Sequence, residues 1–221
     1  MANTAVNKLI DEAARLVVDP QMIRWSKEFW VDAYNAAIRS IVAIRPDALT
    51  KTLDFTCVLG STQTVPEGTR YVVDVVRNKD GRAVSGNINL KMLNDYRPDW
   101  RIEPPAAEVK GWFYDDRNPS NFYVYPPAQD GVQLEVAFAM VPVSIETADY
   151  DAEKPSELIS LYDNAIIEWL VYRAFSEDSE FTANAARAAN ALNAFRTLLG
   201  DKTQADAVTH QKSQDINNAA R

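Results

Sequence analysis

The spacing of apolar side chains changes twice along this chain. Within residues 4–43 apolar residues recur every three or four positions, which places them on one face of a helix. Within residues 51–141 they alternate with polar residues, a pattern typical of strands that bury one face. The helical spacing returns over residues 156–199. Two helical segments therefore flank a β segment, and each segment needs a partner to cover its apolar side.

Turn and capping residues divide these segments into elements. We expect helices at about 4–18, 26–43, 156–175 and 180–199, and a short helix at 89–96. Ser26 and Ser156 stand at N-cap positions, and Gly200 stands where a glycine commonly ends a helix. Strands are expected at about 53–59, 71–77, 82–88, 109–114, 121–125 and 132–141.

The predicted fold class is α+β. We expect an antiparallel helical bundle built from the N- and C-terminal helices, an inserted antiparallel β-sandwich or β-barrel domain, and a C-terminal arm. The expected boundaries are 1–48 for the N-terminal helices, 49–150 for the β-domain, 151–200 for the C-terminal helices and 201–221 for the arm. The arm has only Val208 and Ile216 as large aliphatic residues, so burial cannot offset its ordering entropy. It is either a frayed tail or an arm that orders on a partner.

Charge and cysteine content narrow the possible functions. The chain has 31 acidic and 23 basic residues, a net charge of −8 at pH 7. A surface of that sign repels the phosphate backbone, so we expect no tight binding of DNA through a basic patch. The same charge suits the wall of a channel through which DNA slides without sticking. Cys57 is the single cysteine, and its alternating position predicts a small core residue. We expect no signal peptide and no membrane span, because no apolar run approaches about 18–20 residues.

Residues that commonly carry catalysis or bind metals are sparse. His210 is the single histidine and lies in the polar C-terminal stretch, which argues against a histidine-based triad or a His/Cys metal site. Two acidic groups stand in predicted loops: Asp149, Asp151 and Glu153, and Asp115 with Asp116. The first resembles the start of a calcium loop but lacks the required glycine, so a solvated loop is favoured over calcium. The second fits a turn, with a cryptic carboxylate hydrolase as the weaker alternative. We predict no catalysis, no cofactor and no metal.

Aromatic residues in the β segment allow a second interpretation. Trp112, Tyr114, Tyr123 and Tyr125 share an alternation in two adjacent predicted strands, and Trp100 is near in sequence. Such a row commonly forms cross-strand core pairs, and in some proteins it forms a platform for sugars. A carbohydrate-binding β-module of a virion or surface protein is therefore the alternative function.

Six segments carry a family resemblance: IRW at 23–25, FWVDAYNAAIRSIVAIRPDA from Phe29, VPEGTRYVVDVVRNKDGRAV from Val65, LNDYRPDWR from Leu93, AEVKGWFYDDRNPSNFYVYPP from Ala107, and LYDNAIIEWLVYRAFSEDSEFTANAARA from Leu161. Together they resemble the head-to-tail adaptor (connector) proteins of tailed bacteriophages, particularly short-tailed phages. The order of the segments is the same, and the resemblance covers residues 5–200. The run 66–84, the PDW motif and the YRAF-x-x-D block are jointly specific.

The resemblance implies a structural virion protein, without catalysis. Such adaptors form a homo-oligomeric ring, usually a dodecamer, that docks on the portal protein and completes the head. The ring extends the channel through which genomic DNA passes and seats the tail nozzle or tail tube. The implied location is the portal vertex between head and tail, after synthesis in the host cytoplasm.

The resemblance also suggests which residues make the contacts. In adaptors of this kind the C-terminal segment commonly reaches the portal, so residues 201–221 are expected to form a portal-docking arm. Its candidate contact residues are Val208, Lys212, Ile216 and Arg221. The alanine-rich helix offers a candidate face between subunits, because small side chains allow close approach: Ala185, Ala188 and Ala189.

Overall fold

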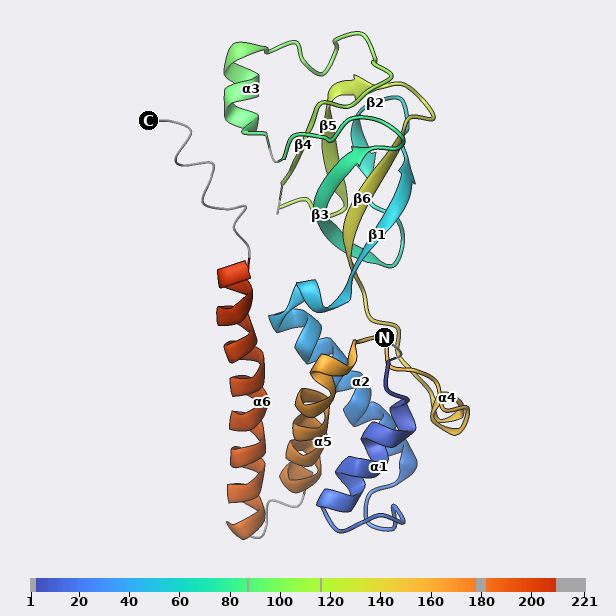
Figure 1. The fold of residues 1–221 in the computed structure, drawn as a ribbon, viewed down its shortest axis with the longest axis vertical. Helices are drawn as coiled ribbons and strands as arrows, with labels where there is room; N and C mark the ends of the chain where they lie inside the picture. The colour runs from blue at the N-terminus through green and yellow to red at the C-terminus, as the bar shows by residue number, and fades with distance from the viewer. Residues whose placement is uncertain (1–2, 87, 116, 178–181, 210–221) are drawn as a thin grey trace. The chain divides into compact units, whose positions relative to one another are not determined.

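The computed structural model describes residues 3–86, 88–115, 117–177 and 182–209. The fold is mixed α/β, with six α-helices and two antiparallel three-stranded sheets in these residues (Figure 1). Contacts divide the chain into two compact units. We call Met1–Ala48 with Pro142–Arg221 the helical unit and Leu49–Val141 the β unit. The β segment is thus inserted into the helical one.

Within the helical unit, three helices pack around one. Its α-helices are α1 (Val6–Leu16), α2 (Lys27–Ile44), α4 (Thr147–Asp151), α5 (Asp163–Glu177) and α6 (Thr182–Thr209). Short 3-10 turns occur at Pro46–Leu49, on the boundary, and at Ser160–Tyr162. Helices α1, α2 and α6 all contact α5, which therefore has apolar residues around most of its circumference (Figure 1). The sequence pattern predicts residues 142–150 in the β-domain, whereas in the structure they lie in the helical unit.

The predicted caps have different outcomes. Ser26 caps α2 as predicted, because its hydroxyl accepts the N–H of Phe29 at 3.3 Å. The Ser156 cap is wrong, since α5 begins only at Asp163 and the buried Ser156 hydroxyl instead bonds the hydroxyl of Tyr34 at 2.8 Å. The predicted stop at Gly200 is wrong too. Helix α6 continues to Thr209, because a glycine inside a helix costs only about 1 kcal/mol and is tolerated.

The β unit contains two sheets and the short helix α3 (Leu90–Tyr96). The strands are β1 (Thr50–Thr56), β2 (Gly60–Thr64), β3 (Thr69–Asn78), β4 (Gly111–Tyr114), β5 (Asn121–Ala128) and β6 (Gln133–Met140). Their orders are β1-β6-β3 and β2-β5-β4, all antiparallel, and the strands described form no closed barrel. The strand predicted at 82–88 is wrong. Its described residues make only isolated bridges, whereas β2 begins at Gly60, where the sequence predicts no strand.

One hydrophobic cluster joins the two sheets. It contains residues of β3 and β6 from the first sheet and of β4 and β5 from the second, including Val75, Val136, Phe122 and Val124, all fully buried. Cys57 lies in this cluster, as predicted, and burial raises the pKa of its thiol to about 12. A smaller cluster around Leu93, Trp100 and Phe113 lies on the other face of the β2-β5-β4 sheet, beneath α3. That sheet is therefore buried on both faces.

Candidate interaction surfaces

A buried carboxylate holds the turn between α1 and α2. The side chain of Asp19 accepts hydrogen bonds from three backbone N–H groups, those of Ile23 (2.9 Å), Arg24 (3.1 Å) and Trp25 (3.0 Å). The turn also contains Val18 at φ +63°, a backbone conformation that β-branched residues rarely adopt. The turn therefore has a single, tightly specified conformation.

Buried amides hold two further loops in the same way. Gln63 is fully buried, and its side chain bonds the N–H and carbonyl of Val58 (2.8 and 2.9 Å) and the carbonyl of Gly60 (3.0 Å). Asn35 bonds both the N–H and the carbonyl of Ile145, each at 2.9 Å. Buried polar groups require such partners, so these contacts order the loops and satisfy the side chains together.

The loops held by these side chains present aliphatic residues to solvent. The exposed fractions are 85% for Val18, 81% for Ile23, 57% for Val58, 65% for Leu59, 50% for Val141 and 64% for Val143. A rigid loop loses little entropy on binding, and exposed apolar residues on such loops are suited to protein contacts. Chain composition gave no sign of these residues, because nothing in it indicates which aliphatic side chains stay uncovered.

Helix α6 packs on α5 with one narrow face. Its buried residues in the range 182–200 are Ala188, Ala191, Phe195 and Leu199. Phe195 contacts Trp169 of α5, with ring centroids 4.9 Å apart. Of the predicted inter-subunit residues, Ala188 lies on this buried face, whereas Ala185 and Ala189 are exposed. Only the latter two are accessible to another subunit as the chain stands.

The C-terminal part of α6 runs past the helix on which it packs. Ring contacts pair Phe195 with Trp169, and the Arg187 guanidinium lies 5.4 Å from the Phe175 ring centroid. The two helices therefore run antiparallel, with Trp169 beside Phe195. Asp163, where α5 begins, then lies level with about residue 201 of α6. Residues 201–209 of α6 therefore extend beyond α5. Val208 lies in this extension, and the other predicted arm residues lie outside the described residues: Lys212, Ile216 and Arg221.

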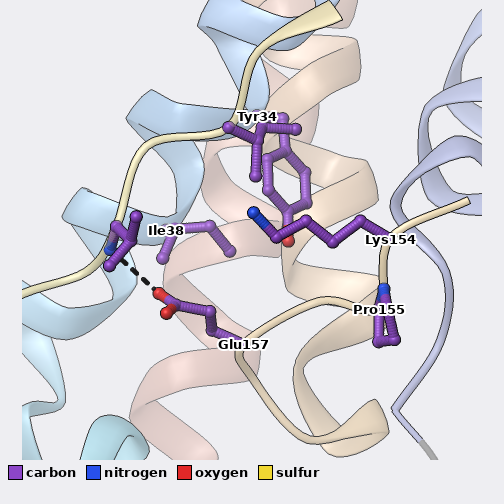
Figure 2. Close-up of a pocket in the computed structure, with 7 residues that line it drawn as sticks. Tyr34, Ile38, Lys154, Pro155 and Glu157 are labelled. Atoms are coloured by element: carbon purple, nitrogen blue, oxygen red, sulfur yellow. Dashed lines mark hydrogen bonds between the residues drawn. The ribbon is translucent and has the colours of Figure 1, made fainter. Parts of the chain in front are cut away.

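Two hollows of the helical unit are lined by residues that the structure describes. Figure 2 shows the first, where Tyr34, Ile38 and Pro155 surround a cavity of about 20 Å³, room for about one water molecule. The Glu157 carboxylate in its wall accepts the N–H of Val143 at 3.0 Å. A second hollow of about 430 Å³ is open to solvent. It is lined by Arg24, Trp25, Ser26, Phe29 and Glu177.

The acidic residues singled out by the sequence are engaged separately. Asp151 pairs with Lys27 at 2.7 Å, and the pKa of Asp149 is lowered by the N–H of Glu146 and by Lys154. The side-chain hydrogen bond from Arg117 lowers the pKa of Asp115. These carboxylates do not converge, and no group of three or more metal-ligating side chains occurs in the part of the chain that is described. Asp116 and His210 lie outside it.

The aromatic residues do not form an exposed row. Trp112 is 5% exposed and packs in the cluster between the sheets with Tyr114. Tyr123 and Tyr125 lie with the cluster beneath α3, where Tyr123 stacks on Phe113 with centroids 4.8 Å apart. The aromatic residues pack in apolar clusters, as the favoured core interpretation predicts, but they are divided between two clusters, so the single shared row is wrong. This removes the platform on which the carbohydrate-binding interpretation depended.

Ordered loops with exposed aliphatic residues and a helix that extends beyond its support are features suited to a structural subunit that works through protein contacts. A model of the SU10 adaptor protein family matches residues 4–216. The chain belongs to the SU10 adaptor protein family, whose members are structural phage adaptors of the virion neck. A search of curated proteins found no match. No helix among the residues described is long and apolar enough to cross a membrane.

Proposed function

We propose that this adaptor forms a homo-oligomeric ring, a dodecamer of the short-tailed phage type, that docks on the portal protein. The ring extends the channel for genomic DNA and seats the tail nozzle or tail tube. The observation that carries the proposal is the extension of the 28-residue helix α6 beyond α5, so that residues 201–209 lie past the end of the helix on which α6 packs. Membership in an adaptor family supports portal and tail proteins as the partners.

The proposal assigns a role to each predicted range. Residues 1–48 and 151–200 form the body of the subunit, and the β unit contacts neighbouring subunits or the tail. Residues 201–221 form the portal-docking arm, with Val208, Lys212, Ile216 and Arg221 as contacts. Burial of this segment on a partner would supply the apolar contacts that its own sequence lacks.

Ring closure requires two different complementary faces on each subunit. The exposed Ala185 and Ala189 of α6 are proposed to lie in one of them. A net charge of −8 is consistent with a lumen that repels DNA phosphates and lets DNA slide. We expect a monomer after synthesis in the host cytoplasm and assembly only on the portal.

Mass photometry of the chain with the portal of the same phage tests the arm. The full chain should add a ring of copies to the portal, whereas a variant lacking residues 201–221 should remain folded and fail to add. Val208→Asp and Ile216→Asp should weaken docking, and Ser213→Asp is the control for added charge. Normal docking of the truncated chain would refute the arm assignment.

A second variant pair tests the face between subunits. Ala189→Arg should prevent ring closure on the portal, because a long charged side chain holds the neighbouring helix away. Ala152→Arg changes an equally exposed alanine near α4 and is the matched control. Equal ring formation by both variants would exclude Ala189 from the interface.

A further inference from the structure

Three of the four sheet edges in the β unit are obstructed. Along β3 the register shifts three times, and Val84 donates its N–H to Val76 at 3.2 Å. Along β4 the N–H of Ile88 bonds the carbonyl of Trp112 at 2.7 Å. The five-residue strand β2 has a register shift beside Gly60. Bulges, short strands and covering segments are how proteins prevent unwanted pairing at sheet edges.

Strand β1 has no bulge and no covering strand among the described residues, although Lys51 places one charge on its core side. It pairs with β6 over seven residues, from Thr50 opposite Ala139 to Thr56 opposite Gln133, without a register shift. It contains no proline. No strand among the described residues pairs with its other side. A regular, exposed edge of this length is a template for another strand.

The hydrogen-bond pattern shows which backbone groups of β1 face outward. The N–H of Cys57 donates to the carbonyl of Val132 at 2.7 Å. The β1–β6 register ends with Thr56 opposite Gln133, so the next pair in the same register is Cys57 opposite Val132. Because bonded and non-bonded positions alternate in an antiparallel pair, Lys51, Leu53 and Phe55 bond β6. The N–H and carbonyl groups of the alternate residues point away from the sheet: Thr52, Asp54 and Thr56.

The side chains of β1 define the strand that would fit. Leu53 is 38% exposed and Phe55 half-buried, although both lie on the core side opposite buried residues of β6. A strand laid along β1 would cover them if its side chains on that side were apolar. On the other side it would meet Thr52, Asp54 and Thr56, which suits hydroxyl or other polar residues.

We propose that the free edge of β1 accepts a β-strand, with apolar residues at alternate positions, from the tail component that attaches to the adaptor. This inference rests on the proposed function, in which the adaptor seats the tail. A described sheet edge of a second copy does not fit as the donor. Two β1 edges pair only about a two-fold axis, which closes a dimer and not a ring, and the described β unit offers no second unobstructed edge for a head-to-tail match.

A proline substitution in β1 can block pairing at the outer edge of the strand without disturbing its pairing with β6. Thr52→Pro removes an outward N–H that β1 does not use in its pairing with β6, so the fold should be retained. Tail binding by portal-bound rings should fall about 100-fold, because a strand can no longer pair at that position. Thr52→Val keeps the N–H and should bind the tail normally. Equal tail binding by wild type and Thr52→Pro would overturn the inference while leaving the proposed function intact.

Amide hydrogen exchange gives a readout that does not depend on a variant. In portal-bound rings the amides of Thr52, Asp54 and Thr56 should exchange fast, and tail binding should slow them, whereas Leu53 should be protected in both states. Protection of these amides before the tail is added would assign the edge to another subunit and refute the inference. Portal-bound rings of wild type that bind no tail would refute the tail-seating function itself, and the inference with it.

Discussion

At the scale of single residues, Val18 is the most unusual position of the chain. It follows the C-terminus of α1, where Val18 N–H bonds the carbonyl of Arg15 and Asp19 N–H bonds that of Ala14 at 2.8 Å. This is the bonding pattern in which a glycine commonly occupies the left-handed position. A valine there has φ +63° and is 85% exposed, so the strained side chain contributes no packing within its unit.

Val18→Gly should therefore stabilise the helical unit. Relief of the left-handed strain, about 1–2 kcal/mol, exceeds the entropy that glycine adds to the unfolded chain, so the net gain should be about 1 kcal/mol. Thermal unfolding would show a rise of roughly 2–4 °C in Tm. Ile23→Gly is the control, because Ile23 is equally exposed without a positive φ, and it should not stabilise. A lower Tm for Val18→Gly would show that the side chain supports the turn.

At the scale of elements, α6 differs from the other long helices. Helices α1, α2 and α5 bury residues on broad faces, whereas α6 buries four residues in its first 19, two of them alanines. Most of its attachment to α5 therefore comes from Phe195 and Leu199, each 1% exposed. Such a helix is held at one line of contact, and most of its remaining described surface is exposed.

Phe195→Ala should accordingly weaken the helical unit strongly. Loss of the ring and the resulting cavity should lower the free energy of unfolding by about 3–5 kcal/mol. Leu198→Ala changes a neighbouring residue that is 40% exposed and should cost less than about 1 kcal/mol. Urea denaturation of the two variants measures the difference. Similar losses in both would mean that α6 is not attached through Phe195.

At the scale of the whole molecule, each unit buries a group that must stay protonated. Tyr34 lies in the helical unit, and burial raises its pKa to about 12. Cys57 lies in the β unit, and burial likewise raises its pKa to about 12. Because the folded pKa exceeds the unfolded one, these groups leave stability unchanged at neutral pH, and stability falls once the unfolded state begins to lose the proton.

The free energy of unfolding should therefore decline with pH from about 9 upward, first through Cys57 and then, above about pH 10, through Tyr34. The part from Tyr34 amounts to roughly 2 kcal/mol between pH 10 and 12. Tyr34→Phe should flatten the curve in that interval. Tyr96→Phe, at a tyrosine that is 79% exposed, should leave the slope unchanged. Chemical denaturation at a series of pH values measures both slopes, and identical slopes would contradict the assignment.

Local patterns predicted much of the secondary structure. The spacing of apolar residues located α2, and Ser26 marked its start, because a helix start depends on residues within one turn. The alternation after Lys51 predicted β1 and placed Cys57 in a core. The alternation of residue types could not show that Trp112 and Tyr123 lie on opposite faces of the sheet. The face of each residue depends on the register between the two strands, which alternation within one strand does not give.

The sequence by itself determined which segments are helical or extended and which side of each is apolar, because those properties depend on neighbours within a few residues. The tertiary structure alone decided what depends on distant partners. Asn35 is used to hold Ile145, 110 residues away, and Ser156 bonds Tyr34 instead of capping a helix. The free edge of β1 likewise results from the order of strands in the sheet. Pairing between distant segments is chosen by the packing of the whole chain, so no local pattern encodes it.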